Sequence, residues 1–289
     1  MKLNERLTYI SDDTQITFAT NKRISSFWWS GADGLDGLDN NLFTIKGAGQ
    51  DGETLTGQNL QARTITVEGQ IYKDASARQR LIHAINPKNK GRLVYSNDNI
   101  TRWIPCAISK APAIARDGRF PNFQVEFYCP YPFWREGSGD KQSVTDIALW
   151  IPAFSFEFEI PEDGFEFGYR SPSLIVNVAN NGDVEAGILV EFRALGSTAN
   201  PSLININTQE KLSLTRYMQA GDIIRVSTVY GGKKAELTRG GVTTNIFNTV
   251  DADSTWLQLA VGDNLLRYDA TEIDNIEVSI YYDATYLGV

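Results

Sequence analysis

The sequence predicts a mainly β protein of two domains, and three observations support this fold class. Its 289 residues, at roughly 150 residues per domain, suffice for two cores without disulfides or metals. Hydrophobic residues make up 42% and charged residues 21%, as in ordinary globular proteins. Short apolar segments with alternating polar residues recur along most of the chain, separated by turn residues. We expect an N-terminal β-sandwich or barrel-like domain with one helix and a C-terminal β-sandwich or jelly roll.

The clearest strand of the first half is 63–72. Its alternation places Ile65, Val67 and Ile71 on one face. Another strand, Arg92–Tyr95, follows the helix.

One helix is predicted between these two strands. Asp74 is the expected N-cap, and Asn86-Pro87 ends the helix. His83 lies one position beyond the apolar stripe, so we interpret it as structural or exposed rather than catalytic. The stripe itself consists of Ala77, Leu81, Ile82 and Ile85.

A long hairpin is expected next. Residues 102–109 lead out, Asp117-Gly118 forms a two-residue turn, and 120–128 return. Cross-strand partners then have residue numbers that sum to 235, which places Cys106 opposite Cys129. Without a signal peptide we expect reduced, partly buried thiols rather than a disulfide.

The second half is predicted to be a separate β-sandwich. Arg135–Ser143 is polar and contains glycine and serine, as linkers do. We therefore divide the chain into residues 1–135, a linker and hairpin at 136–171, and a sandwich at 172–289. The strands expected in the second half are Leu174–Val178, Gly187–Arg193, Leu203–Ile206, Lys211–Thr215, Asp222–Val229, Trp256–Leu259 and Ile276–Ile280.

The two halves carry opposite charge. Residues 1–135 hold 17 Lys/Arg and 13 Asp/Glu, a net charge of +4, whereas the remainder has a net charge of −12. Within the first half, Lys73–Arg119 contains ten basic and three acidic residues. Such a segment is a nucleic-acid footprint, a solvated face or one side of a charge-complementary protein contact. We favour the last two, because no recognition helix or interleaved basic and aromatic motif accompanies it, and expect no specific nucleic-acid binding.

Nothing in the sequence indicates an enzyme, a metal site or a cofactor. Two cysteines and one histidine make a structural zinc site improbable, and a single histidine leaves little room for a catalytic triad. Gly47–Gly52 matches a dinucleotide fingerprint but precedes no helix, so we expect a turn between strands. Asp33–Asp39 has the wrong spacing for a calcium loop, and Gly231–Lys234 is expected to be a hairpin turn. Glu157 and Glu159 fit the polar side of an amphipathic strand better than a glycosidase pair.

An amphipathic hairpin over 154–169 is the candidate docking element. Pro161–Gly164 supplies its turn, so Phe158 faces Phe167 and Phe156 faces Tyr169. An aromatic face of this size is unfavourable in solvent and should be covered. We favour an inter-domain or inter-subunit contact, although two further strands of the C-terminal sheet fit nearly as well. The candidate docking residues are Phe154, Phe156, Phe158, Phe165, Phe167 and Tyr169.

No targeting or membrane segment is expected. Met1–Arg6 lacks the apolar core of a signal peptide, which disfavours export by that route. The longest apolar run, Ile147–Phe154, contains Pro152 and is far shorter than a membrane span.

Taken in order and spacing, several motifs resemble the distal tail protein (Dit) family of siphophages over nearly the whole chain. They include Arg63-x-Ile-x-Val-x-Gly-x-Ile71, the helix from Arg80-Leu81 to Asn86-Pro87, Gly91-x-Leu93-x-Tyr95, Cys106, Phe123-x-Val125-x-Phe127-x-Cys129, Pro132-Phe133-Trp134, Asn181-Gly-Asp183, Asn200-Pro201, Ala220-Gly-Asp222, Asp253-Ser-x-Trp256-Leu-x-Leu259, and Gly262-x-Asn264 with Tyr268.

The resemblance implies a structural role in the tail tip of a phage or prophage. Such proteins form a hexameric ring through the N-terminal domain, and their C-terminal domain is a galectin-like sandwich. The ring joins the tail tube to the tip or baseplate, so the implied partners are tail-tube, tape-measure-associated, tip, baseplate or receptor-binding proteins. The implied location is the virion tail tip, after assembly in the host cytoplasm. The alternative is a carbohydrate-binding adhesion module acting through 172–289, although Trp256 is expected to pack in the core.

Overall fold

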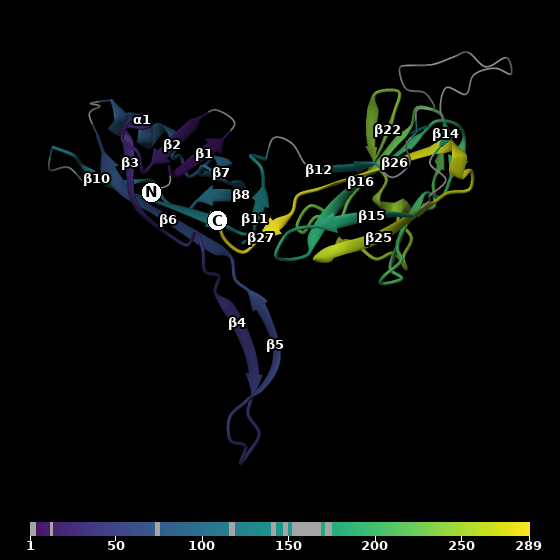
Figure 1. Ribbon diagram of the computed structural model, residues 1–289, viewed down its shortest axis with the longest axis horizontal. Helices are drawn as coiled ribbons and strands as arrows, with labels where there is room; N and C mark the ends of the chain where they lie inside the picture. Colours follow the sequence, from purple (N-terminus) through teal and green to yellow (C-terminus); the bar gives the residue numbers. More distant parts are fainter. Residues whose placement is uncertain are drawn as a thin grey trace, which may run out of the picture. The chain divides into compact units, whose positions relative to one another are not determined.

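The computed structural model describes residues 4–11, 14–72, 76–115, 119–139, 143–146, 150–151, 169–170 and 175–289. The chain divides into two compact units, Met1–Lys141 with Thr285–Val289, and Gln142–Ala284 (Figure 1). No helix in the described ranges is both long and apolar enough to cross a membrane.

A seven-stranded barrel forms the body of the first unit. Its strands follow the order β8-β7-β1-β2-β3-β6-β10, and β10 pairs with β8 to close it. Neighbours are antiparallel except β2 and β3, which are parallel. The short strands β9, β11 and β27 extend the sheet beyond the barrel. The bounds are β1 (Arg6–Ser11), β2 (Gln15–Ala19), β3 (Phe27–Asp33), β6 (Arg63–Ile71), β7 (Lys90–Ser96), β8 (Thr101–Ile108), β9 (Ala113–Ile114), β10 (Asn122–Cys129), β11 (Trp134–Glu136) and β27 (Thr285–Tyr286).

Alternation in the sequence decides which side chains fill this barrel. In β6, Ile65, Val67 and Ile71 are buried on one face, as predicted. Aromatic side chains from other strands meet them. The rings of Phe18 and Phe123 lie 5.4 Å apart. Burying each such side chain stabilises the fold by about 1.5–3 kcal/mol.

The predicted helix is α1 (Ala77–Ala84), shorter than its stripe suggested. Ala77 and Leu81 are buried, but Ile82 is 41% exposed, so its place in the apolar stripe is wrong. Its side chain lies one position round the helix from Leu81, which takes it out of the buried face. The helix N-cap is Ser76, while Asp74 lies outside the described residues. His83 is exposed.

The predicted hairpin register is confirmed at the base of β8 and β10. Ile108 pairs with Phe127 and Ala107 with Tyr128, so partner numbers sum to 235. Further out, Ile114 of β9 pairs with Phe123, a register shifted by two residues. The Asp117-Gly118 turn itself lies outside the described residues.

The end of the sequence returns to the first unit. Arg135 of β11 pairs with Thr285 of β27, and Trp134 pairs with Tyr286. Two predictions therefore need correction: Thr285–Val289 do not belong with the second unit, and Arg135 forms strand rather than linker. Pairing with residues 150 positions away decides both, and no local pattern reports it.

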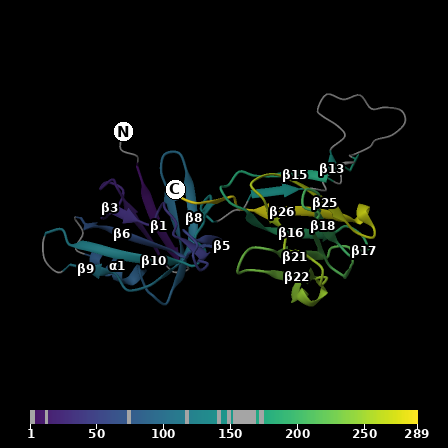
Figure 2. The same cartoon turned by 90° about the horizontal axis from the view of Figure 1, so that it is seen from below.

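The second unit is a β-sandwich of two main sheets, seen from a second side in Figure 2. One has the order β12-β26-β16-β21-β22-β23, with β24 also pairing with β16, and the other has the order β15-β25-β18-β19. The pairs β17–β20 and β13–β14 are separate. The bounds are β12 (Ser143–Asp146), β13 (Trp150–Ile151), β14 (Tyr169–Arg170), β15 (Ile175–Asn180), β16 (Ala186–Ala194), β17 (Thr198–Ala199), β18 (Ser202–Asn205), β19 (Lys211–Ser213), β20 (Tyr217–Met218), β21 (Ile223–Ser227), β22 (Lys234–Arg239), β23 (Val242–Asn245), β24 (Gln258–Leu259), β25 (Gly262–Asp269) and β26 (Ile276–Tyr282), with 3-10 helices η1 (Phe247–Thr249) and η2 (Ile273–Asn275).

Alternating strands supply the core of the sandwich, and buried polar side chains hold its loops. Ile188, Val190 and Phe192 of β16 are fully buried. Asn264 is also buried, and its Nδ2 donates to the carbonyl oxygens of Val178, Ala260 and Gly262. Such a side chain replaces the backbone partners that an irregular loop lacks.

Candidate functional site

A two-stranded arm is the most unusual element of the first unit. β4 (Asn40–Ile45) and β5 (Thr54–Leu60) pair only with each other and run away from the barrel (Figure 1). They join where β3 ends and β6 begins. The loop between them contains Gly47–Gly52, so the prediction of a turn between strands is confirmed. Within this loop Gly49 and Gly52 have φ of 77° and 78°, a conformation that favours glycine.

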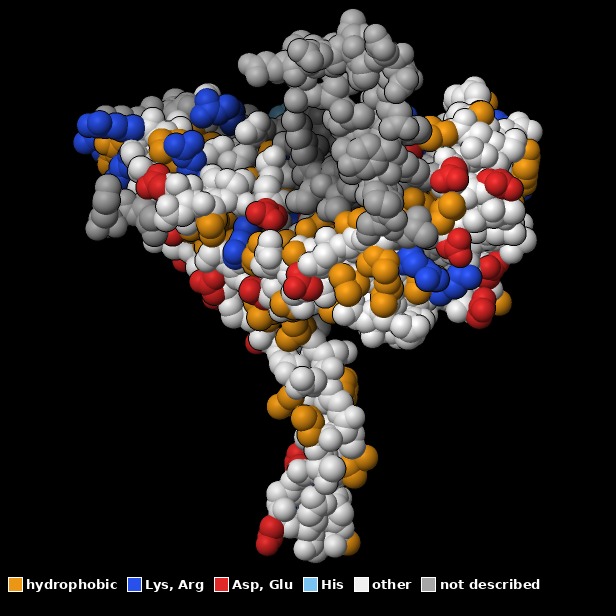
Figure 3. Space-filling model, turned by 45° about the vertical axis from the view of Figure 1, so that its right-hand side comes forward, with side chains coloured by type: hydrophobic (Ala, Val, Ile, Leu, Met, Phe, Trp, Pro, Cys, Tyr) orange, Lys and Arg blue, Asp and Glu red, His pale blue; other side chains and the backbone are white. Residues whose placement is uncertain are grey.

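The arm is apolar on both faces. Neither strand contains a charged residue, and Leu42, Phe43, Ile45 and Leu55 are 52–63% exposed. Successive strand residues point to opposite sides, so Leu42 and Phe43 lie on different faces. Figure 3 shows hydrophobic side chains, drawn in orange, along the arm. An isolated two-stranded hairpin with unpaired edges is only marginally stable in water. We therefore expect another protein surface to cover the arm.

The base of the arm is held by one buried arginine. Arg63, at the start of β6, is 3% exposed. Its guanidinium donates to the carbonyl oxygens of Gly34, Leu35, Pro132 and Leu287. Burial lowers the pKa of this guanidinium. Through these hydrogen bonds the guanidinium connects three loop segments at the base of the arm.

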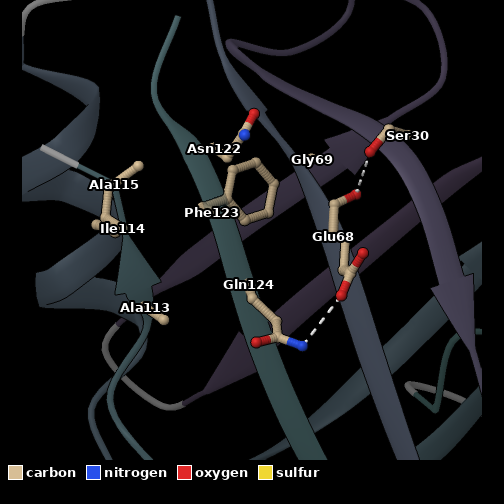
Figure 4. Close-up of a pocket in the computed structure, with 9 residues that line it drawn as sticks. All are labelled: Ser30, Glu68, Gly69, Ala113, Ile114, Ala115, Asn122, Phe123 and Gln124. Carbon is tan, nitrogen blue, oxygen red and sulfur yellow. Dashed lines mark hydrogen bonds between the residues drawn. The ribbon is translucent and has the colours of Figure 1, made fainter. Parts of the chain in front are cut away.

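A shallow groove lies on the outer face of β3, β6, β10 and β9. It has a volume of about 550 Å³. Gly69 forms part of its lining, and a Cβ there would lie 2.1 Å from the Trp28 carbonyl oxygen, so only glycine fits. Gln124 Nε2 donates to Glu68 Oε1 at 3.0 Å, and Ser30 Oγ donates to the Glu68 carbonyl oxygen at 3.1 Å (Figure 4). Glu68 is the single titratable side chain in the lining, which is too little for acid–base chemistry but suits contact with a peptide segment.

The two cysteines are buried and reduced within the barrel. The β8–β10 pairing ends at Ala107 and Tyr128, one residue short of each cysteine. Cys106 lies opposite Gly91 of β7, and Cys129 lies opposite Arg63 of β6. Burial raises the pKa of both thiols, that of Cys129 to about 12. Neither thiol is ionised at neutral pH, so neither is suited to nucleophilic attack or metal binding. Within the described ranges no group of three or more His, Cys, Asp or Glu is placed to hold a metal ion.

The structure does not test the docking role of the six predicted residues, but it corrects the predicted pairing of Tyr169 with Phe156. Phe154, Phe156, Phe158, Phe165 and Phe167 lie outside the described residues. Tyr169 belongs to β14, whose backbone pairs with β13. There Tyr169 lies opposite Ile151, five residues earlier in the chain than Phe156, the partner that the sequence predicted.

The second unit carries a partly exposed aromatic pair. Phe247 and Trp256 stack with their ring centroids 5.3 Å apart and 21° between planes. Lys233 Nζ lies 5.3 Å from the centroid of Trp256. Phe247 is exposed, and Trp256 packs against the core while remaining partly exposed. The expectation that Trp256 packs in the core is therefore confirmed, although part of its ring stays exposed.

The sequence patterns did not predict the projecting arm or the hydrogen-bonding role of Arg63. The arm did leave a signal, because two uncharged segments with apolar residues flank a glycine-containing loop. Arg63 opens one of the motifs that carry the family resemblance, but no local pattern indicates its carbonyl partners, which lie 28–224 positions away.

Two family models match the chain. A phage tail protein RIFT-related domain matches residues 11–129, and a siphovirus-type tail component C-terminal domain matches residues 181–286. A search of curated proteins found no match.

Solved structures share this fold. SPP1 Dit, described as a paradigm of hub adsorption apparatus in phages infecting Gram-positive bacteria, is similar with a TM-score of 0.68 and 16% identity, over 97% of this chain and 99% of that one. A chain of the phage P2 baseplate in its activated conformation with Ca has a TM-score of 0.60 and 9% identity, with 100% of both chains covered. A chain of the corresponding baseplate with Sr has a TM-score of 0.57 and 8% identity, with 99% of both covered.

Proposed function

We propose that copies of this chain close into a hexameric ring. The chain belongs to the siphovirus distal tail component family and is a structural hub protein of the phage tail tip. The ring would join the tail tube to the tip or baseplate and its adhesion proteins. Tape-measure-associated proteins would be further partners, and assembly would take place in the host cytoplasm. The role requires binding surfaces and no catalytic group.

The arm is the observation that carries this proposal. Its apolar side chains lie on both faces and lack cover from any described part of their own unit. Fully burying Leu, Ile or Phe side chains contributes about 1.5–3 kcal/mol each, so covering the arm against another copy would supply a substantial part of an interface. A contact between two different surfaces of identical chains generates a ring when the rotation closes. The family implies six-fold closure.

The test is the assembly state of arm variants. Phe43→Ser with Ile45→Ser should abolish assembly while leaving the melting temperature of the monomer nearly unchanged, because both side chains are already exposed. Sedimentation velocity and negative-stain microscopy would measure this, with the wild-type ring at six times the 32.2 kDa chain mass. Val242→Ser, at a position 65% exposed on β23, is the matched control. A wild-type chain that stays monomeric both alone and with its neighbouring tail proteins would contradict the ring.

Carbohydrate binding through the second unit is the second candidate function. The stacked pair Phe247 and Trp256 offers partly exposed ring surface, and Tyr230 is 78% exposed in the turn that also holds Lys233. Aromatic surface next to polar groups is the usual composition of ligand sites. Glycan arrays and calorimetry on the full-length protein would test it. Saturable millimolar or tighter binding that Trp256→Ala removes and Val242→Ala retains would support this function, and its absence across the array would exclude it.

A further inference from the structure

The first unit is electrically polarised along three of its strands. The start of β3, the end of β6 and the start of β10 lie together at one end of the barrel, which we name the cationic end. β3 ends, β6 begins and the arm departs at the other, which we name the acidic end. With nine residues in β6 and about 3.3 Å per residue, the two ends lie roughly 25–30 Å apart. In Figure 3, Lys and Arg side chains gather at the side of this unit away from the arm.

Aromatic rings hold the charges of the cationic end in place. Lys22 Nζ lies 4.4 Å from the ring centroid of Trp28 and 5.0 Å from that of Tyr72. Tyr72 stacks on Phe120 at 4.8 Å, and the Arg119 guanidinium lies 5.7 Å from the Phe120 centroid. Lys22 and Arg119 are exposed, and no described carboxylate forms an ion pair with either. Cations presented in this way suit a partner that carries carboxylates.

The acidic end presents three exposed carboxylates: Asp33 at the end of β3, and Asp36 and Asp39 in the loop leading to the arm. Asp33 Oδ1 accepts from the Gly34 N–H at 2.9 Å, and Asp36 Oδ1 accepts from the Val289 N–H at 3.2 Å. These bonds orient the loop. The buried Arg63 guanidinium lies within electrostatic range of Asp36, but none of the three aspartates forms an ion pair with a described cation.

The two ends do not neutralise each other within one chain. Their separation exceeds the Debye length of about 8–10 Å at physiological ionic strength. A nucleic acid is a poorer occupant of the cationic end, because the chain's own cations and aromatic neighbours already occupy the ring faces on which bases would stack. A second copy of this chain brings the complementary charges.

We propose that the acidic end of one copy docks on the cationic end of the next, with Asp33, Asp36 and Asp39 facing Lys22 and Arg119. The inference rests on the proposed ring and specifies its contact. The groove described above adjoins the cationic end, because Asn122 and Ala115 line it beside Phe120. The arm departs beside the aspartates, so the same head-to-tail contact brings apolar arm side chains toward Ala113, Ile114 and Ala115 of the neighbouring groove. Opposite ends of one unit meet, as a heterologous ring contact requires.

Charge reversal on each side tests the contact. Lys22→Glu with Arg119→Glu is the cationic-end variant, and Asp36→Lys with Asp39→Lys is the acidic-end variant. Each alone places like charges together and should weaken association at least about tenfold in sedimentation velocity at low salt. Mixing the two variants should restore rings, because each altered end then meets a complementary end, and a chain carrying all four changes should assemble by itself. Arg267→Glu with Lys211→Glu, exposed cations of the second unit, controls for net charge and should assemble as the wild type does.

The outcomes separate this contact from the ring itself. If both single-side variants form rings as the wild type does, the proposed contact is wrong but the proposed ring is not contradicted. Loss of assembly that neither mixing nor the four-fold swap restores would also overturn it. A wild-type chain that does not associate under any condition would overturn the proposed ring and this contact together.

Discussion

Arg63 is the residue on which the loops of the first unit converge. Its side chain is buried, no carboxylate accepts a hydrogen bond from it, and four carbonyl oxygens accept hydrogen bonds from its N–H groups. The ring of Trp134 lies beside it, with 5.9 Å from the guanidinium carbon to the ring centroid. A planar fork of five donors serves separate carbonyl groups in a way that a lysine ammonium does not.

Removing this fork should be costly. Arg63→Leu leaves buried carbonyl oxygens without donors, at about 1–3 kcal/mol each when they stay dry, so we expect a loss of about 3 kcal/mol or more in the free energy of unfolding. Arg63→Lys should lose an intermediate amount. Urea denaturation measures both, with exposed Arg267→Leu as control. A loss below about 0.5 kcal/mol for Arg63→Leu would show that water or neighbouring groups replace the guanidinium.

Because of Asp222, the free energy of unfolding of the second unit should fall at low pH. Hydrogen bonds from the Arg239 guanidinium, with a further one from the Gln219 N–H, hold the pKa of this buried carboxyl below its ordinary value. A lowered folded-state pKa means stability that is present above the ordinary value of about 3.9 and lost as the pH falls through the folded value. Asp222→Asn should therefore show a smaller loss of unfolding free energy between pH 5 and pH 2. Equal acid dependence of the two proteins in urea titrations would contradict this role.

Among the elements, the arm and the barrel strands differ in what covers them. Strands such as β6 bury one face in their own barrel, whereas β4 and β5 expose both. Alternation of apolar and polar residues shows that side chains point to opposite faces of a strand. It does not show whether another part of the protein covers either face. The same holds for α1, where Ile82 fits the apolar stripe and yet lies exposed.

The predicted aromatic hairpin at 154–169 remains a second candidate for docking. Phe156→Ser with Phe158→Ser should weaken assembly more than it lowers the melting temperature, because covered aromatic area would be lost from an interface. Sedimentation velocity and calorimetry on the full-length protein compare the two effects. If assembly is intact while the monomer melts much earlier, these residues belong to the core of the second unit.

For the molecule as a whole, the chain passes between the units twice, near residue 142 and near residue 284. The second unit is therefore an insertion in the first as far as the chain is concerned. Its natural limits are 142–284, not the 172–289 expected from the sequence, because β12 pairs with β26 and β27 pairs with β11.

A fragment spanning 142–284 should fold alone with one cooperative thermal transition. A fragment spanning 172–289 should melt at a lower temperature, because it lacks the β12 pairing and carries five residues whose partners are in the other unit. Circular dichroism would compare the two fragments. Identical melting temperatures would show that β12 adds nothing to the sandwich, and the absence of cooperativity in both would show that its core is shared.

The local features of this protein follow from its sequence. Alternation identified the buried face of β6, a two-residue turn predicted the β8–β10 register at its base, and Gly47–Gly52 was recognised as a turn between strands. Each of these depends on residues close together in the chain, so that period, turn chemistry and spacing suffice.

The remaining features depend on contacts that exist only in the folded molecule. It showed that β4 and β5 lack cover, that Arg63 reaches Leu287, and that cations and aspartates occupy opposite ends of the same strands. These features depend on contacts between residues 28–224 positions apart or on which surfaces have no neighbour. A periodic pattern records which side of a strand is apolar, but burial and electrostatic polarity are properties of the folded surface as a whole.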